Sequence, residues 1–220
     1  MGMDTTFVEE PVVQTMNLWT MAQYGGWIMI LLLILFAGAI YLFVERMVVL
    51  RKSMQEDKSF MDRIKDYIHE GKIDSAINLC RATNTPSARM VEKGISRIGR
   101  PMQDVQVAVE NVGNLEISNL EKGLVIMATI AGGAPMLGFL GTVLGMVQTF
   151  YNMSQNASGV IEMSALSEGM YQAMVTTIGG LIVGILAMFA YNVLVARIDQ
   201  VVRQLEGRTM EFMDLLNEPA

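Results

Sequence analysis

Three threonines place hydroxyl groups inside uncharged, strongly apolar runs of the sequence. Thr142 lies in GAPMLGFLGTVLGMVQTF (133–150), and Thr176 and Thr177 lie in AMVTTIGGLIVGILAMFAYN (173–192). A hydroxyl both donates and accepts hydrogen bonds, so a set of hydroxyls could line a polar path through an apolar wall. The plainer alternative is that each hydroxyl bonds the carbonyl one turn back in its own helix. The residue types alone leave both interpretations open.

Thr142 and Thr177 are expected at nearly the same depth in a membrane. Thr142 lies eight residues before Phe150, and Thr177 lies six residues after Tyr171, where the two apolar spans meet the outer boundary. A rise of ~1.5 Å per residue then places the hydroxyls about 12 and 9 Å below that boundary. On antiparallel neighbouring helices, such matched positions favour a polar-lined path, to which Thr176 adds a third hydroxyl.

The threonine-bearing runs contain no side chain that titrates near neutral pH. No Asp, Glu, Lys or Arg occurs between Lys122 and Glu162 or between Glu168 and Arg197, and the single histidine is His69. A proton path normally shows an ionisable group at membrane depth. If protons pass, another polypeptide must therefore bring the acid.

Long charge-free stretches predict an all-α membrane protein with three transmembrane helices. The two stretches just described and a third, between Glu10 and Glu45, each exceed the ~20 apolar residues that cross a bilayer as a helix. We expect an outer N-terminal interfacial segment (1–26), span one (27–44), a cytoplasmic helical domain (45–124), span two (125–150), an outer hairpin loop (151–170), span three (171–195) and a cytoplasmic C-terminal helix (196–220).

The distribution of basic residues predicts the orientation. All sixteen lysines and arginines lie at 46–122 or 197–208, so the positive-inside rule places the N-terminus and the hairpin loop outside and the C-terminus in the cytoplasm. Pro101 opens a helix that we expect to continue unbroken into span two. Span three is expected to continue to about Leu215. Together these helices would form a stalk inside the cell.

Small residues at helical spacing predict close packing of spans two and three. They are Gly138, Gly141 and Gly145 in span two and Gly180 and Gly184 in span three. Small residues let membrane helices approach closely, and the plainest use of them is packing of the hairpin on itself. Span one lacks the pattern, so we expect it on the lipid-facing outside. Pro135 should bend span two, either as a static feature or as a hinge.

Composition excludes several classes of function. The net charge of −6 argues against nucleic-acid binding. A single cysteine, Cys80, permits no intrachain disulfide, and we expect neither a metal nor a cofactor. No nucleotide-binding, hydrolase or metalloprotease motif is found, so we expect no enzymatic activity.

The twenty methionines are dispersed, which favours adaptable packing. Glu110, Glu116 and Glu121 are expected on a solvated helix face, with an inner partner surface as the alternative.

The apolar runs resemble signatures of the MotA/TolQ/ExbB proton-channel family. The similar segments are APMLGFLGTVLGMVQTF (134–150), AMVTTIGGLIVGILAMFAYN (173–192), GGW (25–27) before span one and ER (45–46) after it. In chain length and in the segment FLGTVLGM (139–146), the chain most resembles the ExbB-like biopolymer transport proteins. TolQ is the next most similar branch, whereas MotA usually has four spans.

The resemblance implies a homopentamer in the bacterial inner membrane around a central pore. Inside the pore would sit helices of an ExbD-like single-span partner whose membrane aspartate carries the proton, and a TonB-like protein would draw work from proton flow. Thr142 and Thr177 match the family's pore threonines. Gln172 falls where some members carry a glutamate. A TolQ-like role and a non-conducting membrane scaffold are the alternatives, and three unequal spans argue against a transporter built from inverted repeats.

Overall fold

The computed structural model describes residues 26–54, 59–155 and 163–217, and the regular elements in these ranges are all α-helices. The helices are α2 (Gly26–Met54), α3 (Phe60–His69), α4 (Ile73–Thr83), α5 (Pro86–Ile95), α6 (Met102–Glu121), α7 (Leu124–Gln155) and α8 (Met163–Asn217). The expected outer segment 1–26 lies outside the described residues except for Gly26. The predicted fold class is confirmed, because the described residues include three helical stretches that are long and apolar enough to cross a membrane.

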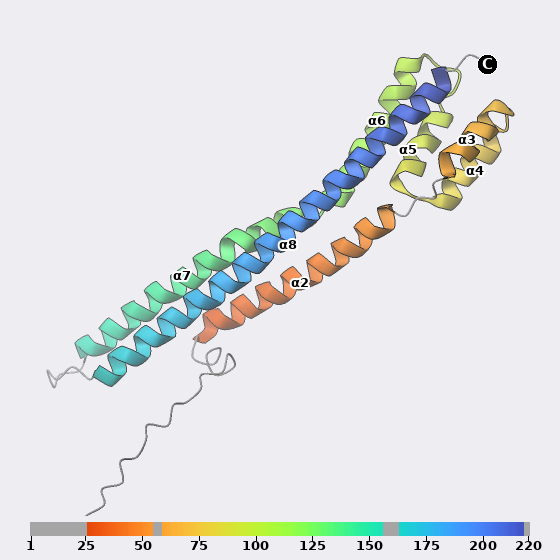
Figure 1. The fold of residues 1–220 in the computed structure, drawn as a ribbon. Coiled ribbons are helices and arrows are strands. Elements are labelled where there is room, and N and C mark those ends of the chain that lie inside the picture. Colours follow the sequence, from red (N-terminus) through yellow and green to blue (C-terminus); the bar gives the residue numbers. More distant parts are fainter. Residues whose placement is uncertain (1–25, 55–58, 156–162, 218–220) are drawn as a thin grey trace, which may run out of the picture.

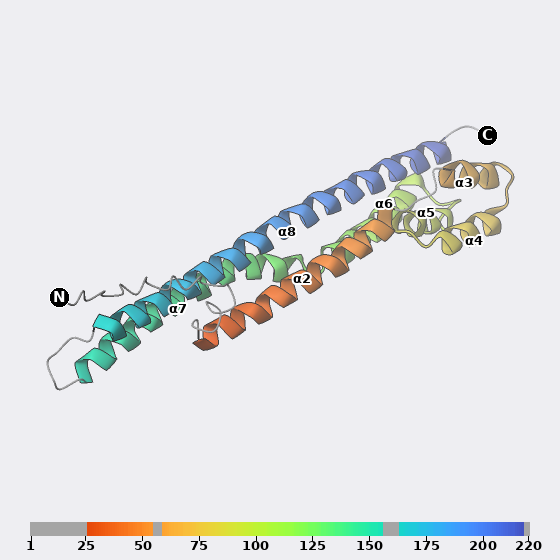
Figure 2. The ribbon, with the colours of Figure 1, turned by 60° about the horizontal axis from the view of Figure 1, so that its bottom comes forward.

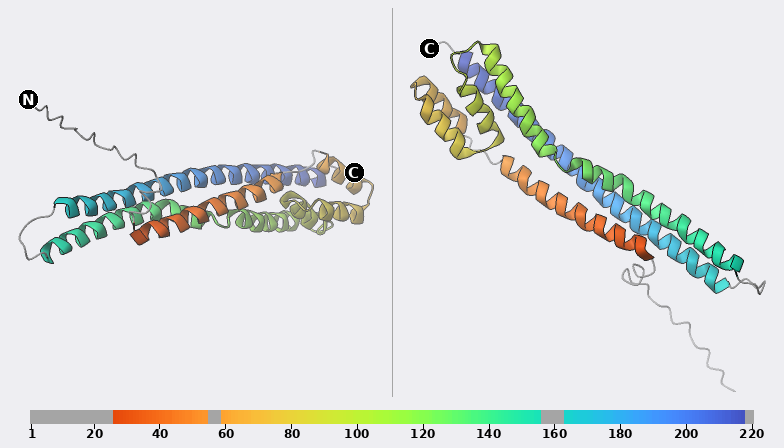
Figure 3. Two further views of the ribbon diagram at one scale, coloured as in Figure 1. Left: turned by 90° about the horizontal axis from the view of Figure 1, so that it is seen from below. Right: turned by 180° about the vertical axis from the view of Figure 1, so that it is seen from behind.

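The molecule is a long rod with two regions (Figure 1). At one end α2, α7 and α8 run side by side, and at the other end α3 to α6 gather around the last turns of α8. Figures 2 and 3 show the same arrangement from other sides, with α8 running through both regions. The expected extension of span three is confirmed, since α8 continues as one helix to Asn217.

The apolar residues of the membrane-type helices are exposed over most of their surface. Only 17% of the apolar 18-residue segment of α2 is buried, and 28% of each of the corresponding segments within Met102–Gln155 and Leu166–Asn217. In water such surfaces would be unstable, whereas lipid tails are as apolar as the side chains themselves. The exposed surface is therefore the surface that a bilayer or another membrane helix covers.

The predicted unbroken helix from Pro101 into span two is wrong at one point. Helix α6 ends at Glu121 and α7 begins at Leu124, because Lys122 is extended (φ −53°, ψ 133°) and Gly123 is left-handed (φ +86°). Only glycine adopts that conformation without strain from a Cβ atom. The guanidinium of Arg46 on α2 lies at this break and donates from Nη1 to the carbonyl oxygen of Asn119 at 3.3 Å. It thereby satisfies one of the free carbonyls at the end of α6.

The helices of the hairpin reach further than expected into segment 151–170. Helix α7 continues to Gln155 and α8 begins at Met163, so helical turns occupy both ends of the predicted loop. The residues between them lie outside the described ranges.

The stalk is held by a packed core and by ion pairs between its helices, of which Arg89–Glu116 is the more buried. Phe60 and Ile64 of α3 and Phe212 of α8 are almost fully buried, and the ring of Phe212 packs against Gly94 of α5. Arg89 on α5 forms a bidentate salt bridge with Glu116 on α6, in which Nε donates to Oε1 at 2.7 Å and Nη2 donates to Oε2 at 2.6 Å. Hydrogen bonding to Glu116 raises the pKa of Arg89. The expectation that Glu116 belongs to a solvated face is wrong, since its side chain is only 14% exposed.

Candidate functional site

Helices α7 and α8 approach so closely at the glycine positions that a methyl group has no room. A Cβ atom built on Gly138 would lie 2.8 Å from the carbonyl oxygen of Thr176 and 3.0 Å from the Cα atom of Gly180. A Cβ on Gly180 would lie 2.6 Å from the carbonyl oxygen of Ala134. Real Cβ atoms essentially never approach other atoms within 3.0 Å, so the two backbones pack directly on each other.

The other three glycines extend the same contact along the pair. A Cβ on Gly141 would meet the Thr176 hydroxyl at 2.6 Å, and one on Gly145 would meet the Cβ atom of Ala173 at 3.0 Å. A Cβ on Gly184 would clash with the ring of Pro135. Pro135 therefore packs across the pair, and α7 remains helical through it.

Three threonine hydroxyls and two backbone carbonyls form one polar cluster between the helices. The hydroxyls of Thr142 and Thr177 contact each other directly across α7 and α8. The Thr142 hydroxyl lies 3.0 Å from the carbonyl oxygen of Ala173, on the other helix, and 3.4 Å from that of Gly138, in its own helix. The Thr177 hydroxyl lies 3.3 Å from the Gly138 carbonyl. The hydroxyls thus bond mainly between helices, unlike the purely local bond that most membrane threonines make.

Thr176 takes a different position from the other two threonines. Its side chain is 2% exposed, and its hydroxyl donates to the carbonyl of Ala173 at 2.7 Å and lies 3.4 Å from that of Gly138. Thr142 and Thr177 are only partly buried. Thr176 is therefore enclosed by the helix pair, whereas the Thr142–Thr177 pair keeps some surface open to a neighbour.

The Thr142–Thr177 pair lies on the side of the hairpin that faces away from α2. On α8, a Cβ at Gly179 would meet Met29 and Leu32 of α2 within 3.1–3.6 Å. Gly179 is two residues from Thr177, and at ~100° per residue its side of the helix points about 160° away from the threonine. On α7, Gly141 faces Ile28 of α2.

Exposed apolar side chains frame the hydroxyl pair. One turn before and one turn after each threonine lie Phe139 (65% exposed), Met146 (38%), Met174 (54%) and Leu181 (45%). The described part of the chain thus presents two hydroxyls within an otherwise apolar face, which we call the threonine face (Phe139, Thr142, Met146, Met174, Thr177 and Leu181).

The site offers hydrogen bonding but no charge. Helix α7 and residues 169–196 of α8 contain no Asp, Glu, Lys, Arg or His. Within the described ranges no group of three His, Cys, Asp or Glu residues is placed to hold a metal ion. Each hydroxyl has one proton to donate and two lone pairs to accept. Either hydroxyl could therefore accept a hydrogen bond from a protonated carboxyl group. It could also donate a hydrogen bond to a carboxylate by rotating away from a backbone carbonyl.

Sequence reasoning missed a fourth hydroxyl near the expected outer end of the hairpin. Thr149 is 7% exposed, and its hydroxyl donates to the carbonyl of Gly145 at 2.8 Å. A Cβ on Gly169 of α8 would clash with this hydroxyl. The signal was present, since Thr149 follows Thr142 by two helical turns, but its pairing with Gly169 depends on where the helices cross. Gln172 also lies near this end, with its amide nitrogen 3.0 Å from a Cβ built on Gly26 of α2.

Three apolar spans and a glycine-packed helix pair that carries hydroxyls but no charge define a multi-pass membrane protein with a polar intramembrane site. Within that class the chain belongs to the MotA/TolQ/ExbB proton channel family, whose sequence profile matches residues 82–207. This range contains all of α7, α8 as far as residue 207, and all of the threonines described above.

Curated relatives agree with the family assignment. An ExbB homolog of biopolymer transport type from Methanothermobacter thermautotrophicus is 31% identical over 164 residues, which are 74% of this chain and 57% of that protein. The Tol-Pal system protein TolQ of Haemophilus influenzae is 26% identical over 188 residues, 80% of this chain and 82% of that protein. The biopolymer transport protein ExbB of Aquifex aeolicus is 40% identical over 79 residues, 36% of this chain and 52% of that protein. The match to the Methanothermobacter protein covers less than two thirds of its length.

Proposed function

We propose that copies of this chain build the uncharged lining of a proton conduit, with Thr142 and Thr177 facing the path. The observation that carries the proposal is the threonine face: its two hydroxyls lie opposite α2 and are the polar groups on an exposed apolar surface. A surface that faced only lipid would gain nothing from half-open hydroxyls. We propose a pentamer, as the family resemblance implies, in which α2 lies on the outer rim.

The proton carrier in this proposal is a carboxyl group on a companion membrane helix. A carboxylate facing Phe139 or Leu181 would be desolvated at a large energetic cost, which protonation removes. A carboxylate beside Thr142 or Thr177 would instead accept a charge-assisted hydrogen bond. The companion helix would therefore alternate between apolar and hydroxyl-bearing positions as its carboxyl gains and loses a proton. We propose an ExbD-like single-span protein as this companion.

The family membership supports a proposal for the location and for the biological task. We propose an inner-membrane position with the N-terminus outside and the stalk in the cytoplasm, in agreement with the distribution of lysine and arginine. The proposed task is to energise TonB-dependent transport across the outer membrane. Work in a Tol-Pal system is the second candidate, because the similarity to TolQ extends over 80% of the chain.

The test is proton flux through the reconstituted complex of this chain and its companion. Thr142→Val and Thr177→Val keep the shape of the side chain and remove the hydroxyl. Loss of a hydrogen bond to a charged group costs about 1.5–3 kcal/mol, so each variant should lower the flux about 10- to 100-fold. Thr129→Val is the matched control, because Thr129 is exposed on α7 and its hydroxyl donates to the Val125 carbonyl of the same helix at 2.8 Å.

Assembly must be measured beside flux. Size-exclusion chromatography of each variant shows whether the complex still forms, so that loss of structure is not counted as loss of conduction. If both valine variants assemble and conduct like Thr129→Val, the threonine face is not the path. If the unaltered complex assembles and conducts nothing, the chain is a membrane scaffold instead.

A further inference from the structure

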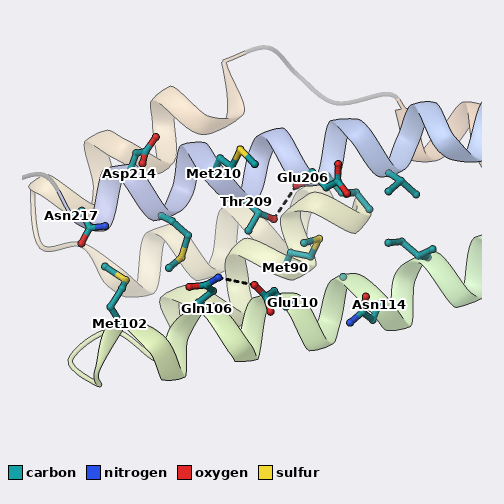
Figure 4. A pocket seen from close by; sticks show the side chains of 15 residues that line it. Met90, Met102, Gln106, Glu110, Asn114, Glu206, Thr209, Met210, Asp214 and Asn217 are labelled. Atoms are coloured by element: carbon teal, nitrogen blue, oxygen red, sulfur yellow. Dashed lines mark hydrogen bonds between the residues drawn. The ribbon is translucent and has the colours of Figure 1, made fainter.

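A groove opens between α6 and α8 near the C-terminal end of α8 (Figure 4). Its volume is about 560 Å³. The floor is apolar, with Met90 of α5, Ile117 of α6 and Val202, Leu205 and Met213 of α8. Gly113 deepens the groove, since a Cβ there would lie 2.8 Å from the methyl group of Met90. The groove has room for a few apolar side chains of another molecule.

The walls of the groove carry negative charge only. Glu110 on α6 and Glu206 and Asp214 on α8 line it, and no lysine, arginine or histidine does. In Figure 4, Glu110 and Glu206 lie on the two opposing helices. Glu110 accepts a hydrogen bond from the side-chain amide of Gln106 at 2.8 Å. The groove is thus an apolar slot with one carboxylate on its α6 side and two on its α8 side.

Methionines give this slot an adaptable surface. Met90, Met102, Met210 and Met213 all line it, and Met210 is 68% exposed although the stalk carries the charged residues of a water-facing segment. Unbranched methionine side chains repack around partners of different shape, and for that reason Met-rich surfaces bind amphipathic helices. A role in binding at the groove would also explain part of the high methionine content of the chain.

We propose that this groove binds a cationic amphipathic helix of a partner protein, with apolar anchors on the methionine floor and lysine or arginine side chains against the carboxylates. Helix-in-groove recognition uses anchors spaced one turn apart, which suits a slot that runs between two long helices. Helix α6 of a second copy of this chain would suit the groove less well, because it has no basic residue. Its charged residues are Asp104, Glu110, Glu116 and Glu121. Docking two such helices would place like charges together. The proposal stands independently of proton conduction.

The test measures binding of a defined probe to the full chain in nanodiscs of uncharged phosphatidylcholine. The probe is a fluorescein-labelled helix of about five turns, made of leucine and lysine at helical spacing, and its counterpart carries glutamate in place of lysine. Fluorescence anisotropy reports binding, and empty nanodiscs give the background. We expect the lysine peptide to bind, the glutamate peptide not to bind, and binding to weaken as salt rises.

Two variants and one matched control locate the binding site. Glu110→Gln with Glu206→Gln should weaken binding about three- to tenfold, because each removes one exposed charge pair. Asp104→Asn with Asp199→Asn removes the same charge from the same two helices outside the groove and should leave binding unchanged. Asn114→Trp fills the groove from its exposed wall and should abolish binding.

Several results would overturn the proposal. Equal binding of both peptides would show unspecific apolar adhesion. Equal weakening by the two double variants would show attraction to net charge rather than to the groove. Absence of peptide binding, with Asn114→Trp shifting the size of the purified particle, would show that another copy of the chain covers the groove instead.

Discussion

The contact at Gly138 gives the sharpest test of how α7 and α8 are held together. In Gly138→Ala the new methyl carbon would start 2.8 Å from the Thr176 carbonyl oxygen and 3.0 Å from the Cα atom of Gly180, whereas ordinary contacts begin at 3.4 Å. Both obstacles are backbone atoms, so no side chain can turn aside. The helices must separate by about 0.6 Å at this point, and overpacking of this kind costs about 1–3 kcal/mol.

Gly133→Ala is the matched control on the same helix. A Cβ at Gly133 meets no atom of the described chain within 4 Å. Both substitutions gain the same helix propensity of alanine over glycine, about 1 kcal/mol in water, so this gain cancels in the comparison. We expect Gly138→Ala to be less stable than Gly133→Ala by about 1–3 kcal/mol.

The assay is reversible unfolding of the purified protein in mixed micelles, followed by circular dichroism. Gly138→Ala should unfold at the lower denaturant fraction. Equal stability of the two variants would refute the close approach of α7 and α8 at Gly138, and with it the geometry of the hydroxyl cluster.

Three further predictions concern the stalk and its junction with the membrane region. Glu116→Gln should lower the free energy of unfolding by about 1–2 kcal/mol, because it breaks the two-pronged bond to Arg89; thermal unfolding measures this, and an unchanged midpoint would contradict it. Gly123→Ala should cost about 1–2 kcal/mol in the same assay, since Gly123 has φ +86°. Burial raises the pKa of the Cys80 thiol from 9.0 to about 12, so maleimide at pH 8 should modify the folded chain about 1,000-fold more slowly than the unfolded chain. As pH rises above 9, the unfolded thiol loses its proton first, so this group should make folding less stable.

The spans could be predicted from the sequence because each is a long charge-free run, and this pattern depends only on the bilayer. The helix break at Gly123 could not. Glycine is also tolerated within helices, and only the extended Lys122 and the closeness of Gly123 to Arg46 show that the chain turns there. A local sequence window contains no information on that distant contact.

For the threonines, likewise, the sequence predicts the depth in the membrane but not the direction in which each side chain points. Equal depth of Thr142 and Thr177 followed from counting residues, and the structure brings their hydroxyls into contact. The enclosure of Thr176 depends on the crossing of α7 over α8 at Gly138 and Gly141, which spacing alone does not fix. Similarly, Glu116 resembled its solvated neighbours in the sequence, and only the position of α5 supplies Arg89 as its partner.

The central claim is that the threonine face lines a shared path while α2 stays outside. A cryo-electron microscopy map of the complex with its companion, in nanodiscs, tests this most directly. We predict several copies around a central cavity, with Thr142 and Thr177 facing it, a companion carboxyl within hydrogen-bonding distance of one of them, and α2 on the rim. A monomeric particle, or an oligomer with α2 at the centre and both threonines facing lipid, would contradict the claim.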